Sequence, residues 1–353
     1  MEKLRVAIIG AGQIARVSHI TNYQSREEVE VVAVCDTNLE AAANVASQFH
    51  IPRYFQDHIT MIKTVRPDAV SICIPNKFHA RVTCDALELG CHVLCEKPPA
   101  LAVEEARLME AKAKSNQRLL TFGFHFRYGE NVRLLKTKID HGDFGSIYNA
   151  KVVWTRRRGI PGWGNFINKD LQGGGPLIDI GSHILDLATY LLDYPEIDYV
   201  CATSHDNIGK NGSGIGFMGR WDPERFTVED SLFGFIRFKN GSSINLETSF
   251  ALNMKDKDCR NLYLYGDKLG ASVFPLEIYG EEYNQMMNSS YLYDDAKDLH
   301  AAEINNFVNA CLGKEELLIT PKQAVYIQTL ICALYESAQQ GKSVSIIPGD
   351  GLI

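Results

Sequence analysis

The stretch Leu4-Arg5-Val6-Ala7-Ile8-Ile9-Gly10-Ala11-Gly12-Gln13-Ile14-Ala15 decides the fold of the chain. Leu4–Ile9 is a short apolar run, typical of a strand buried on both faces, and it ends directly on Gly10. Gly10 permits a tight turn, Gly12 lets the backbone approach a phosphate, and the small Ala15 keeps the following helix close to the strand. Because the positive end of that helix faces the turn, the stretch predicts a site for a dinucleotide pyrophosphate.

An acidic residue completes this nucleotide-binding pattern. The next apolar run, Val29–Cys35, ends on Asp36, about twenty residues past the glycines. A carboxylate there accepts hydrogen bonds from the adenosine ribose hydroxyls and repels the extra phosphate of NADP, so the predicted cofactor is NAD. An ordinary strand-to-helix turn would explain the glycines alone, but not a strand, helix and acidic strand end in register. The predicted cofactor contacts in this region are Gly10, Gly12, Gln13, Ile14 and Asp36.

Length and charge limit the class of protein. The chain has 353 residues, beyond the size at which a single hydrophobic core usually stops growing, so two domains are expected. A formal net charge of −7 gives no electrostatic footprint for nucleic acid or for an anionic membrane surface. No apolar run is long enough to cross a bilayer, and Met1–Lys3 lead into a strand rather than a signal-peptide core. A cytoplasmic location is therefore predicted.

The cysteines favour a structural role. The chain has nine, most of them inside apolar runs and none in a C-x-x-C pair, which is typical of buried reduced thiols. The group Cys91, His92, Cys95 and Glu96 has the residue types of a metal site. In a strand, however, Cys91 and Cys95 face away from His92 and Glu96, so no metal is predicted.

Residues 1–122 alternate short β runs with helical stretches, the pattern of an α/β, doubly wound parallel sheet, or Rossmann domain. The expected strands are Leu4–Ile9, Val29–Cys35, Ala69–Ile74, His92–Cys95 and Leu119–Phe122, and the expected helices include Leu39–Phe49, His79–Leu89 and Val103–Ser115. Ligands bind beyond the carboxyl ends of such strands, so the NAD site is expected along that edge.

Residues 123–353 are expected to form a second, α+β domain that binds substrate and mediates oligomerisation. Asn240-Gly241 lies between the β runs Ser231–Phe238 and Ser242–Phe250, which is a strong hairpin signal. The prediction is a large, mostly antiparallel open sheet with one helix, Leu177–Leu192, inserted into it. Whether the C-terminal helix packs back on the first domain is left open.

Two features of the second domain bear on assembly and on access to the site. An antiparallel sheet often leaves one face free, and Phe250 and Leu252 alternate with polar neighbours, which favours a homodimer or homotetramer. The segment Gly209–Gly219 holds five glycines in eleven residues and is predicted to be a long loop. It is either an active-site flap or an insertion without function.

Polar residues follow two strands of the predicted parallel sheet. Pro75 and Asn76 follow the third strand, and Glu96 and Lys97 follow the fourth, on the same edge as the glycine turn. These four residues and His79 are predicted to contact the cofactor. His79 fits equally well as a helix-starting residue that meets solvent.

Lys97 has the strongest claim to chemistry on this edge. It lies between a carboxylate and two prolines, which makes it locally rigid, and the tertiary amide before Pro98 permits a cis bond. A rigid ammonium group suits an active site that must hold a hydroxyl or carbonyl oxygen. The alternative is a surface lysine paired with Glu96.

A second candidate constellation runs from Gly173 to Asp186. Gly173-Gly174-Gly175-Pro176 indicates a helix start, and Asp179 and His183 then share one face of the helix. A helix N-terminus favours an anionic aspartate and a neutral imidazole, which can act as a base. Gly181 inside the helix costs about 1 kcal/mol relative to alanine, so a close backbone approach is expected there. Purely structural roles for Asp179 and His183 are the alternative.

Aromatic and guanidinium groups gather between Trp154 and Gly164. Trp163 could stack on a sugar ring or on the nicotinamide, and Arg156 could bond substrate hydroxyls. Three consecutive arginines are commonly part-solvated, so at most two of them are expected to face the site.

Four segments together resemble the glucose-fructose oxidoreductase and inositol dehydrogenase family (Gfo/Idh/MocA), and the resemblance covers the whole chain: Gly10–Ala15, Glu96-Lys97-Pro98, Gly123–Tyr128 and Gly173–Asp186. Four further segments resemble the bacterial D-glucoside 3-dehydrogenases of that family: Gly162–Gly164, Leu171–Gly181, Val228–Gly234 and Leu246–Asn253. Ala15 replaces the third glycine of the common pattern, which the pattern allows. Pro99 stands where other members often have an aliphatic residue, and it could adjust how Lys97 is presented.

The resemblance implies NAD-dependent oxidation of a ring hydroxyl, at C3 of a glucoside, to a 3-keto sugar, and the reverse reduction. It implies Lys97, Asp179 and His183 as catalytic residues, with either Lys97 or His183 as the proton acceptor. The predicted substrate contacts are Arg127, Arg156, Trp163, Asp179 and His183. The alternatives are an inositol or free-sugar dehydrogenase, a glycoside hydrolase that retains NAD and oxidises C3 transiently, and a non-catalytic NAD-binding regulator.

Overall fold

The computed structural model describes residues 3–294 and 297–346. It divides into two compact units: unit 1 is Met1–His125 with Asp298–Gln328, and unit 2 is Phe126–Lys297 with Thr329–Ile353.

This division differs from the expected boundary at residues 298–328, which group with the first unit rather than the second. The reason is packing of the helix α10 (Leu299–Cys311). Its residues Ile304, Phe307 and Val308 are buried in the same hydrophobic cluster as the strands of unit 1. The helix α11 (Pro321–Gln340) contains the second division between the units.

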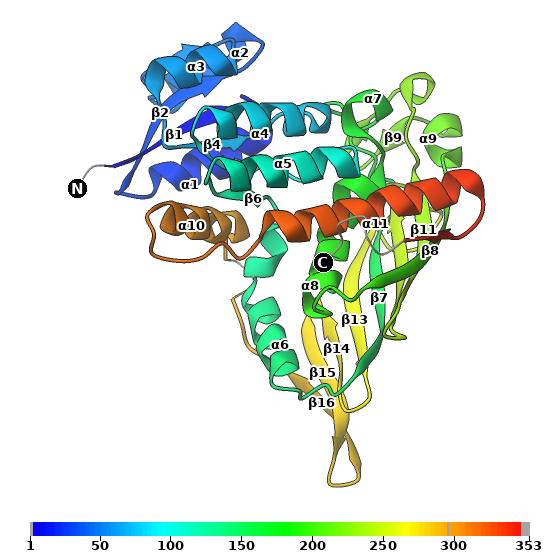
Figure 1. Ribbon diagram of the computed structural model, residues 1–353. Coiled ribbons are helices and arrows are strands. Elements are labelled where there is room, and N and C mark those ends of the chain that lie inside the picture. Colours follow the sequence, from blue (N-terminus) through cyan, green and yellow to red (C-terminus); the bar gives the residue numbers. More distant parts are fainter. Residues whose placement is uncertain (1–2, 295–296, 347–353) are drawn as a thin grey trace. The chain divides into compact units, whose positions relative to one another are not determined.

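Unit 1 is built, in the part of the chain that is described, around a six-stranded sheet in the order β3-β2-β1-β4-β5-β6 (Figure 1). Every neighbouring pair runs parallel. The strands are β1 (Leu4–Ile9), β2 (Val29–Cys35), β3 (Tyr54–Phe55), β4 (Ala69–Ile72), β5 (His92–Cys95) and β6 (Leu120–Phe122). The predicted doubly wound parallel sheet is confirmed. The two-residue β3 is too short for a hydrophobic pattern to reveal.

Helices cover this sheet. The helices α4 and α5 lie side by side in Figure 1, and α10 packs against η1 and α1. Asn38 and Asp57 cap α2 and α3 by accepting hydrogen bonds from backbone N–H groups of the first turn. The helices are η1 (Ala15–Ile20, a π-helix), α1 (Thr21–Gln24), α2 (Leu39–Gln48), α3 (His58–Val65), η2 (Asn76–Phe78), α4 (His79–Glu88) and α5 (Val103–Ser115).

Unit 2 contains a nine-stranded sheet among its described residues, in the order β16-β15-β14-β13-β7-β12-β11-β8-β17 (Figure 1). The pair β7 and β12 is parallel and the other neighbouring pairs are antiparallel, which confirms the mostly antiparallel sheet. Asn240-Gly241 forms the predicted turn between β11 and β12, with Gly241 at φ +92°. The strands are β7 (Ile147–Arg156), β8 (Ile197–His205), β11 (Ser231–Phe238), β12 (Ser243–Ser249), β13 (Asp258–Gly266), β14 (Gly270–Val273), β15 (Leu276–Glu282), β16 (Gln285–Ser290) and β17 (Val344–Ser345).

The helix predicted at Leu177–Leu192 packs on this sheet and begins with a π-helical turn. The π segment η4 spans Leu177–Gly181 and contacts β12, and α8 spans Ser182–Leu191 and contacts β7. A Cβ on Gly181 would lie 2.8 Å from Thr248 Cγ2. The close approach expected at Gly181 is therefore an approach of the helix to the protein's own sheet. The other helices of this region are η3 (His125–Tyr128), α6 (Glu130–Asp140), α7 (Lys169–Gln172), α9 (Asn207–Asn211) and η5 (Pro223–Arg225).

The half-buried carboxylate of Glu229 accepts hydrogen bonds at the amino end of η4. Glu229 accepts hydrogen bonds from the backbone N–H of Gly175 at 2.8 Å and of Leu177 at 3.3 Å, and from the Tyr335 hydroxyl at 2.8 Å. A Cβ on Gly174 would lie 2.0 Å from Tyr335 Oη, and one on Gly175 would lie 2.1 Å from Glu229 O. These glycines are needed because internal groups occupy the space beside them.

The glycine-rich segment Gly209–Gly219 has regular structure, which corrects the prediction of a long loop. It holds the end of α9 and a hairpin formed by β9 (Ile215–Gly216) and β10 (Gly219–Arg220). Asp230 accepts the N–H of Gly209 at 2.8 Å, and Gly162 donates to Met218 O at 2.9 Å. These bonds come from residues distant in sequence, so local composition does not reveal them.

Phe250 does not lie on a free face of the sheet. It is fully buried in a cluster with Ile160, Ile180 and Trp221, whereas Leu252 is half-buried. The strand β12 ends at Ser249, so the period-two alternation no longer assigns Phe250 to a sheet face.

Gly181→Ala is expected to destabilise the protein by about 1–3 kcal/mol, because the added methyl group overpacks the contact with Thr248. Denaturant unfolding measures the change. Gly181→Ala/Thr248→Ser, which removes the opposing methyl, should recover most of the loss. Full stability of the single variant would show that the helix can move off the sheet without cost.

Candidate functional site

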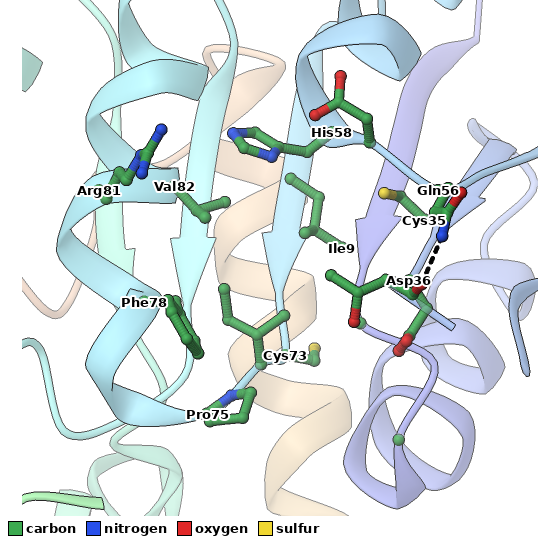
Figure 2. Close-up of a pocket in the computed structure, with 15 residues that line it drawn as sticks. Ile9, Cys35, Asp36, Gln56, His58, Cys73, Pro75, Phe78, Arg81 and Val82 are labelled. Atoms are coloured by element: carbon green, nitrogen blue, oxygen red, sulfur yellow. Dashed lines mark hydrogen bonds between the residues drawn. The ribbon is translucent and has the colours of Figure 1, made fainter. Parts of the chain in front are cut away.

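Unit 1 contains a pocket of about 480 Å³ at the glycine turn, here called the glycine-turn pocket (Figure 2). It lies at the carboxyl ends of β1, β2 and β4, where doubly wound sheets bind their ligands. It is lined by Ile9, Gly10, Gly12, Cys35, Asp36, Thr37, Gln56, Asp57, His58, Cys73, Ile74, Pro75, Phe78, Arg81 and Val82.

The two glycines of the turn have different tasks. Gly10 has φ +106°, and a Cβ there would lie 2.1 Å from the carbonyl oxygen of Cys73. Gly12 has no atom within 4 Å of the place where a Cβ would stand, so its backbone borders open space. Gly10 is therefore required by the fold itself, and Gly12 leaves room for an external group such as a pyrophosphate.

Asp36 ties the second strand to the glycine turn. Its Oδ2 accepts the N–H of Ala11 and its Oδ1 accepts the N–H of Asn38, each at 2.8 Å. A carboxylate offers about four acceptor sites, so Asp36 keeps capacity for ribose hydroxyls. Beside it, Gln56 Nε2 donates to Thr37 O at 3.0 Å (Figure 2). These residues fit the ribose of a dinucleotide.

The other predicted cofactor contacts divide into two groups. Pro75 lines the pocket, whereas Asn76, Glu96 and Lys97 do not. Gln13 is exposed just beyond the turn, and Ile14 packs against the core of unit 1.

His79 holds the edge of the sheet together. It is fully buried, with Nδ1 2.7 Å from Pro98 O and Nε2 2.9 Å from Ile74 O. Burial lowers the pKa of His79, and the two backbone oxygens only partly offset this effect. The ring joins the loops after β4 and β5 rather than facing the pocket, which corrects both of the expected environments, cofactor and solvent.

Lys97 follows β5 on a turn with internal support. It is half-buried, and the Lys97–Pro98 peptide bond is cis. The Lys97 N–H donates to Glu96 Oε2 at 3.2 Å. Glu96 is buried and also bonded to His19, so it serves as a support for the turn.

In unit 2, Asp179 lies on the π segment η4 and His183 lies in the first turn of α8. His183 is 8% exposed and meets two aromatic rings. The Phe126 ring approaches it edge-on with centroids 5.5 Å apart, and the Trp154 ring lies 6.3 Å away. The imidazole therefore lies in a largely apolar setting on the helix that carries Asp179.

Arg156 and Trp163 lie in different environments. Arg156 Nε lies 3.2 Å from Asp258 Oδ2, and its guanidinium lies over the Trp154 ring at 5.5 Å. Trp163 is 48% exposed and meets the Phe166 ring edge-on. Arg156 is thus held next to the aromatic residues around His183, while Trp163 keeps a free surface.

Arg127 is not available to a substrate, which corrects its prediction. It is 2% exposed and forms a two-point ion pair with Asp186, with Nε 2.8 Å from Oδ2. The rings of Tyr190 and Tyr194 lie 5.0 and 5.6 Å from the guanidinium. Burial lowers the pKa of Arg127 and the Asp186 charge outweighs this effect, so the group stays charged as an internal anchor of α8.

Sequence reasoning missed Phe126, Phe274 and Arg260. The Arg260 guanidinium lies 4.6 Å from the Phe274 ring centroid and 5.0 Å from that of Phe126. Arg260 lies opposite Trp154 where β13 pairs with β7. A prediction of this strand register would have placed Arg260 beside the aromatic residues. The described residues contain no group of His, Cys, Asp and Glu arranged to hold a metal ion.

Family models match both units. Residues 4–124 match the oxidoreductase family model for an NAD-binding Rossmann fold, and residues 136–346 match the C-terminal alpha/beta domain of the same family. The chain belongs to the Gfo/Idh/MocA oxidoreductase family. Its predicted cofactor, NAD, agrees with this assignment.

Several relatives of the chain have names that describe dehydrogenases of carbohydrates. The chain is 44% identical to the D-glucoside 3-dehydrogenase of Escherichia coli (strain K12) over 345 residues, 97% of each chain. It is 28% identical to the glucose-6-phosphate 3-dehydrogenase of Bacillus subtilis (strain 168), over 69% of this chain and 67% of the relative. A solved structure of levoglucosan dehydrogenase with NADH and L-sorbose has a TM-score of 0.84 at 21% identity, covering 98% of this chain and 100% of that one. This last similarity concerns the fold.

Gly10→Ala and Gly12→Ala are expected to separate folding from cofactor binding. Gly10→Ala should lower Tm and abolish NAD binding, because the methyl group meets the backbone of Cys73. Gly12→Ala should keep the Tm of the parent chain but weaken NAD binding by about tenfold or more, because its methyl enters the space left for the phosphates. Thermal unfolding and calorimetric titration measure both. Unchanged NAD affinity in Gly12→Ala would contradict the assignment of the turn.

Proposed function

We propose that the protein is an NAD-dependent dehydrogenase that oxidises the C3 hydroxyl of a glucoside to a ketone and catalyses the reverse reduction. The observation that carries the proposal is the 44% identity to a D-glucoside 3-dehydrogenase, over 97% of both chains. The fit of the glycine-turn pocket to a dinucleotide supports the redox class without reference to any relative.

Three residues carry the chemistry in this proposal. His183 removes the proton of the sugar hydroxyl, Lys97 stabilises the developing alkoxide and carbonyl oxygen, and Asp179 orients the imidazole or a neighbouring hydroxyl. NAD, when bound, supplies the hydride acceptor. Lys97 and His183 can exchange the role of proton acceptor without changing the reaction.

The surroundings of His183 support a carbohydrate substrate. Trp154 is half-buried and offers a ring surface to the apolar face of a sugar, with Phe126 packed behind it, and Arg156 offers donors to hydroxyl groups. Low exposure of His183 also limits competition from water for the hydroxyl proton. Trp163 provides a further ring surface for a substrate with a bulky aglycone.

An NAD-retaining glycoside hydrolase is the alternative from another class, since it also begins with oxidation at C3. It produces no net NADH, whereas a dehydrogenase forms one NADH for each glucoside oxidised. An inositol or free-sugar dehydrogenase shares the chemistry and differs in substrate. Activity on glucosides, inositols and free sugars, followed by NADH absorbance, distinguishes the three.

The proposed assembly is a homo-oligomer that uses the sheet of unit 2. Phe233 and Phe235 are half-buried on β11, while their neighbours Leu232 and Ile236 are fully buried on the opposite face. An aromatic face of this kind suits a second copy of the chain. Light scattering of the purified protein measures the state, and a monomer would refute it. No helix in the described ranges is long and apolar enough to span a membrane, and a cytoplasmic location stays a prediction.

Lys97→Met and His183→Ala are each expected to lower kcat by about 10²–10⁴-fold and to leave the Kd for NAD within about threefold. The rate of NADH formation with a glucoside, followed by absorbance, gives kcat, and calorimetry gives the Kd for NAD. The matched controls are the exposed Lys114→Met and His141→Ala, which should keep the parent activity. Turnover close to that of the parent chain in either catalytic variant would remove that residue from the mechanism.

A further inference from the structure

A continuous row of buried polar side chains lies behind the turn that carries Lys97. Tyr23 Oη lies 2.8 Å from Ser71 Oγ, Ser71 Oγ lies 3.1 Å from His19 Nδ1, and His19 Nε2 lies 2.9 Å from Glu96 Oε1. An ionised carboxylate only accepts hydrogen bonds, so His19 Nε2 carries the proton and donates it to Glu96. His19, Tyr23 and Ser71 are fully buried. Water therefore does not compete for the hydrogen bonds between these three side chains.

Glu96 connects the row to Lys97. One of its oxygens accepts from His19, and the other accepts the backbone N–H of Lys97 at 3.2 Å. Burial raises the pKa of Glu96, but the hydrogen bond and charge of His19, with the charges of His300 and Lys97, outweigh burial and lower it to about 2. Glu96 is thus an anion at every working pH, with each oxygen assigned to one donor.

Other groups also lie near Glu96. A Cβ on Gly123 would lie 3.0 Å from Glu96 Oε2. The helix α10 carries His300 and the buried Glu303, and His300 Nδ1 lies 3.7 Å from Glu303 Oε2. The centroid of the His125 ring lies 4.1 Å from that of the His300 ring. Glu303 is a second carboxylate that faces Glu96, whereas His19 Nε2 donates a hydrogen bond to Glu96 Oε1 at 2.9 Å.

We propose that His19 is a positioning residue for Lys97 and acts through Glu96, fixing the backbone of the turn from which the Lys97 ammonium projects. The inference rests on the proposed catalytic role of Lys97. His19 lies on η1, the helix that follows the glycine turn. In this proposal the same helix therefore also supports the turn after β5 from which Lys97 projects.

The physical basis is geometric. Without the His19 donor, the Glu96 carboxylate loses one of its two fixed bonds and can rotate away from the Lys97 N–H. Displacement of a reacting group by about 1 Å can lower turnover by about 10²-fold. His19, Glu96 and Lys97 do not line the glycine-turn pocket, so the affinity for NAD there should change little.

A pair of substitutions separates the two bonds of His19. In His19→Gln the side-chain amide stands near the position of Nε2 and can still donate to Glu96. In His19→Asn the shorter amide stands near Nδ1 and can reach Ser71 but not Glu96. We expect His19→Gln to keep kcat within about threefold, and His19→Asn to lower kcat by about tenfold to a hundredfold with NAD Kd within about twofold. Lys97→Met is measured in parallel.

The outcomes are distinct. Equal kcat in His19→Gln and His19→Asn, whether both high or both low, overturns the proposal, because the bond to Glu96 then makes no difference. Parent-like turnover in Lys97→Met overturns the catalytic assignment instead. If His19→Asn does not fold, His19→Asn/Glu96→Gln removes the buried charge, and its kcat should remain low. Recovery of the parent kcat in that double variant, with Lys97→Met inactive, would also overturn the proposal.

Discussion

The contact between Gly10 and the carbonyl oxygen of Cys73 is the constraint on which the first unit depends. A Cβ at this position would lie 2.1 Å from that oxygen, so no residue other than glycine fits without movement of the backbone. The contact brings the carboxyl ends of β1 and β4 together and opens the glycine-turn pocket beside them. The pocket that fits a dinucleotide therefore depends on the same close approach of the two strand ends.

Carboxylates that accept backbone N–H groups hold the functional segments in both units. Asp36 binds the N–H of Ala11 in the glycine turn, Glu96 binds that of Lys97, and Glu229 binds that of Gly175 ahead of the helix with Asp179 and His183. A hydrogen bond to an ionised acceptor is about twice as strong as one between neutral groups. In each case the acidic residue is distant in sequence or lies just outside the segment that it fixes. These carboxylates thus position the backbone of the segments that carry the residues proposed to react.

Much of the first unit could be predicted from the sequence because its signals are local. Buried strands such as Leu4–Ile9 and Val29–Cys35 are continuous apolar runs, and the glycines and Asp36 follow them at fixed spacing. The errors arise where tertiary partners decide the outcome. Arg127 resembled a substrate ligand because the sequence does not show that it pairs with Asp186, and Gly209–Gly219 resembled a loop because its support comes from Asp230 and from the segment around Gly162. His19 and Arg260 carried no local signal, since a lone histidine on a helix and an arginine in a charged run are common.

The most direct test of the account is the fate of the hydrogen at C3 of the sugar. The protein is incubated with NAD and a methyl glucoside that carries deuterium at C3 alone, and the reduced cofactor is examined by NMR and mass spectrometry. The account predicts one deuterium at C4 of the nicotinamide for each 3-keto sugar formed. Reduced cofactor without deuterium, or loss of the methyl aglycone with no reduced cofactor, would contradict it.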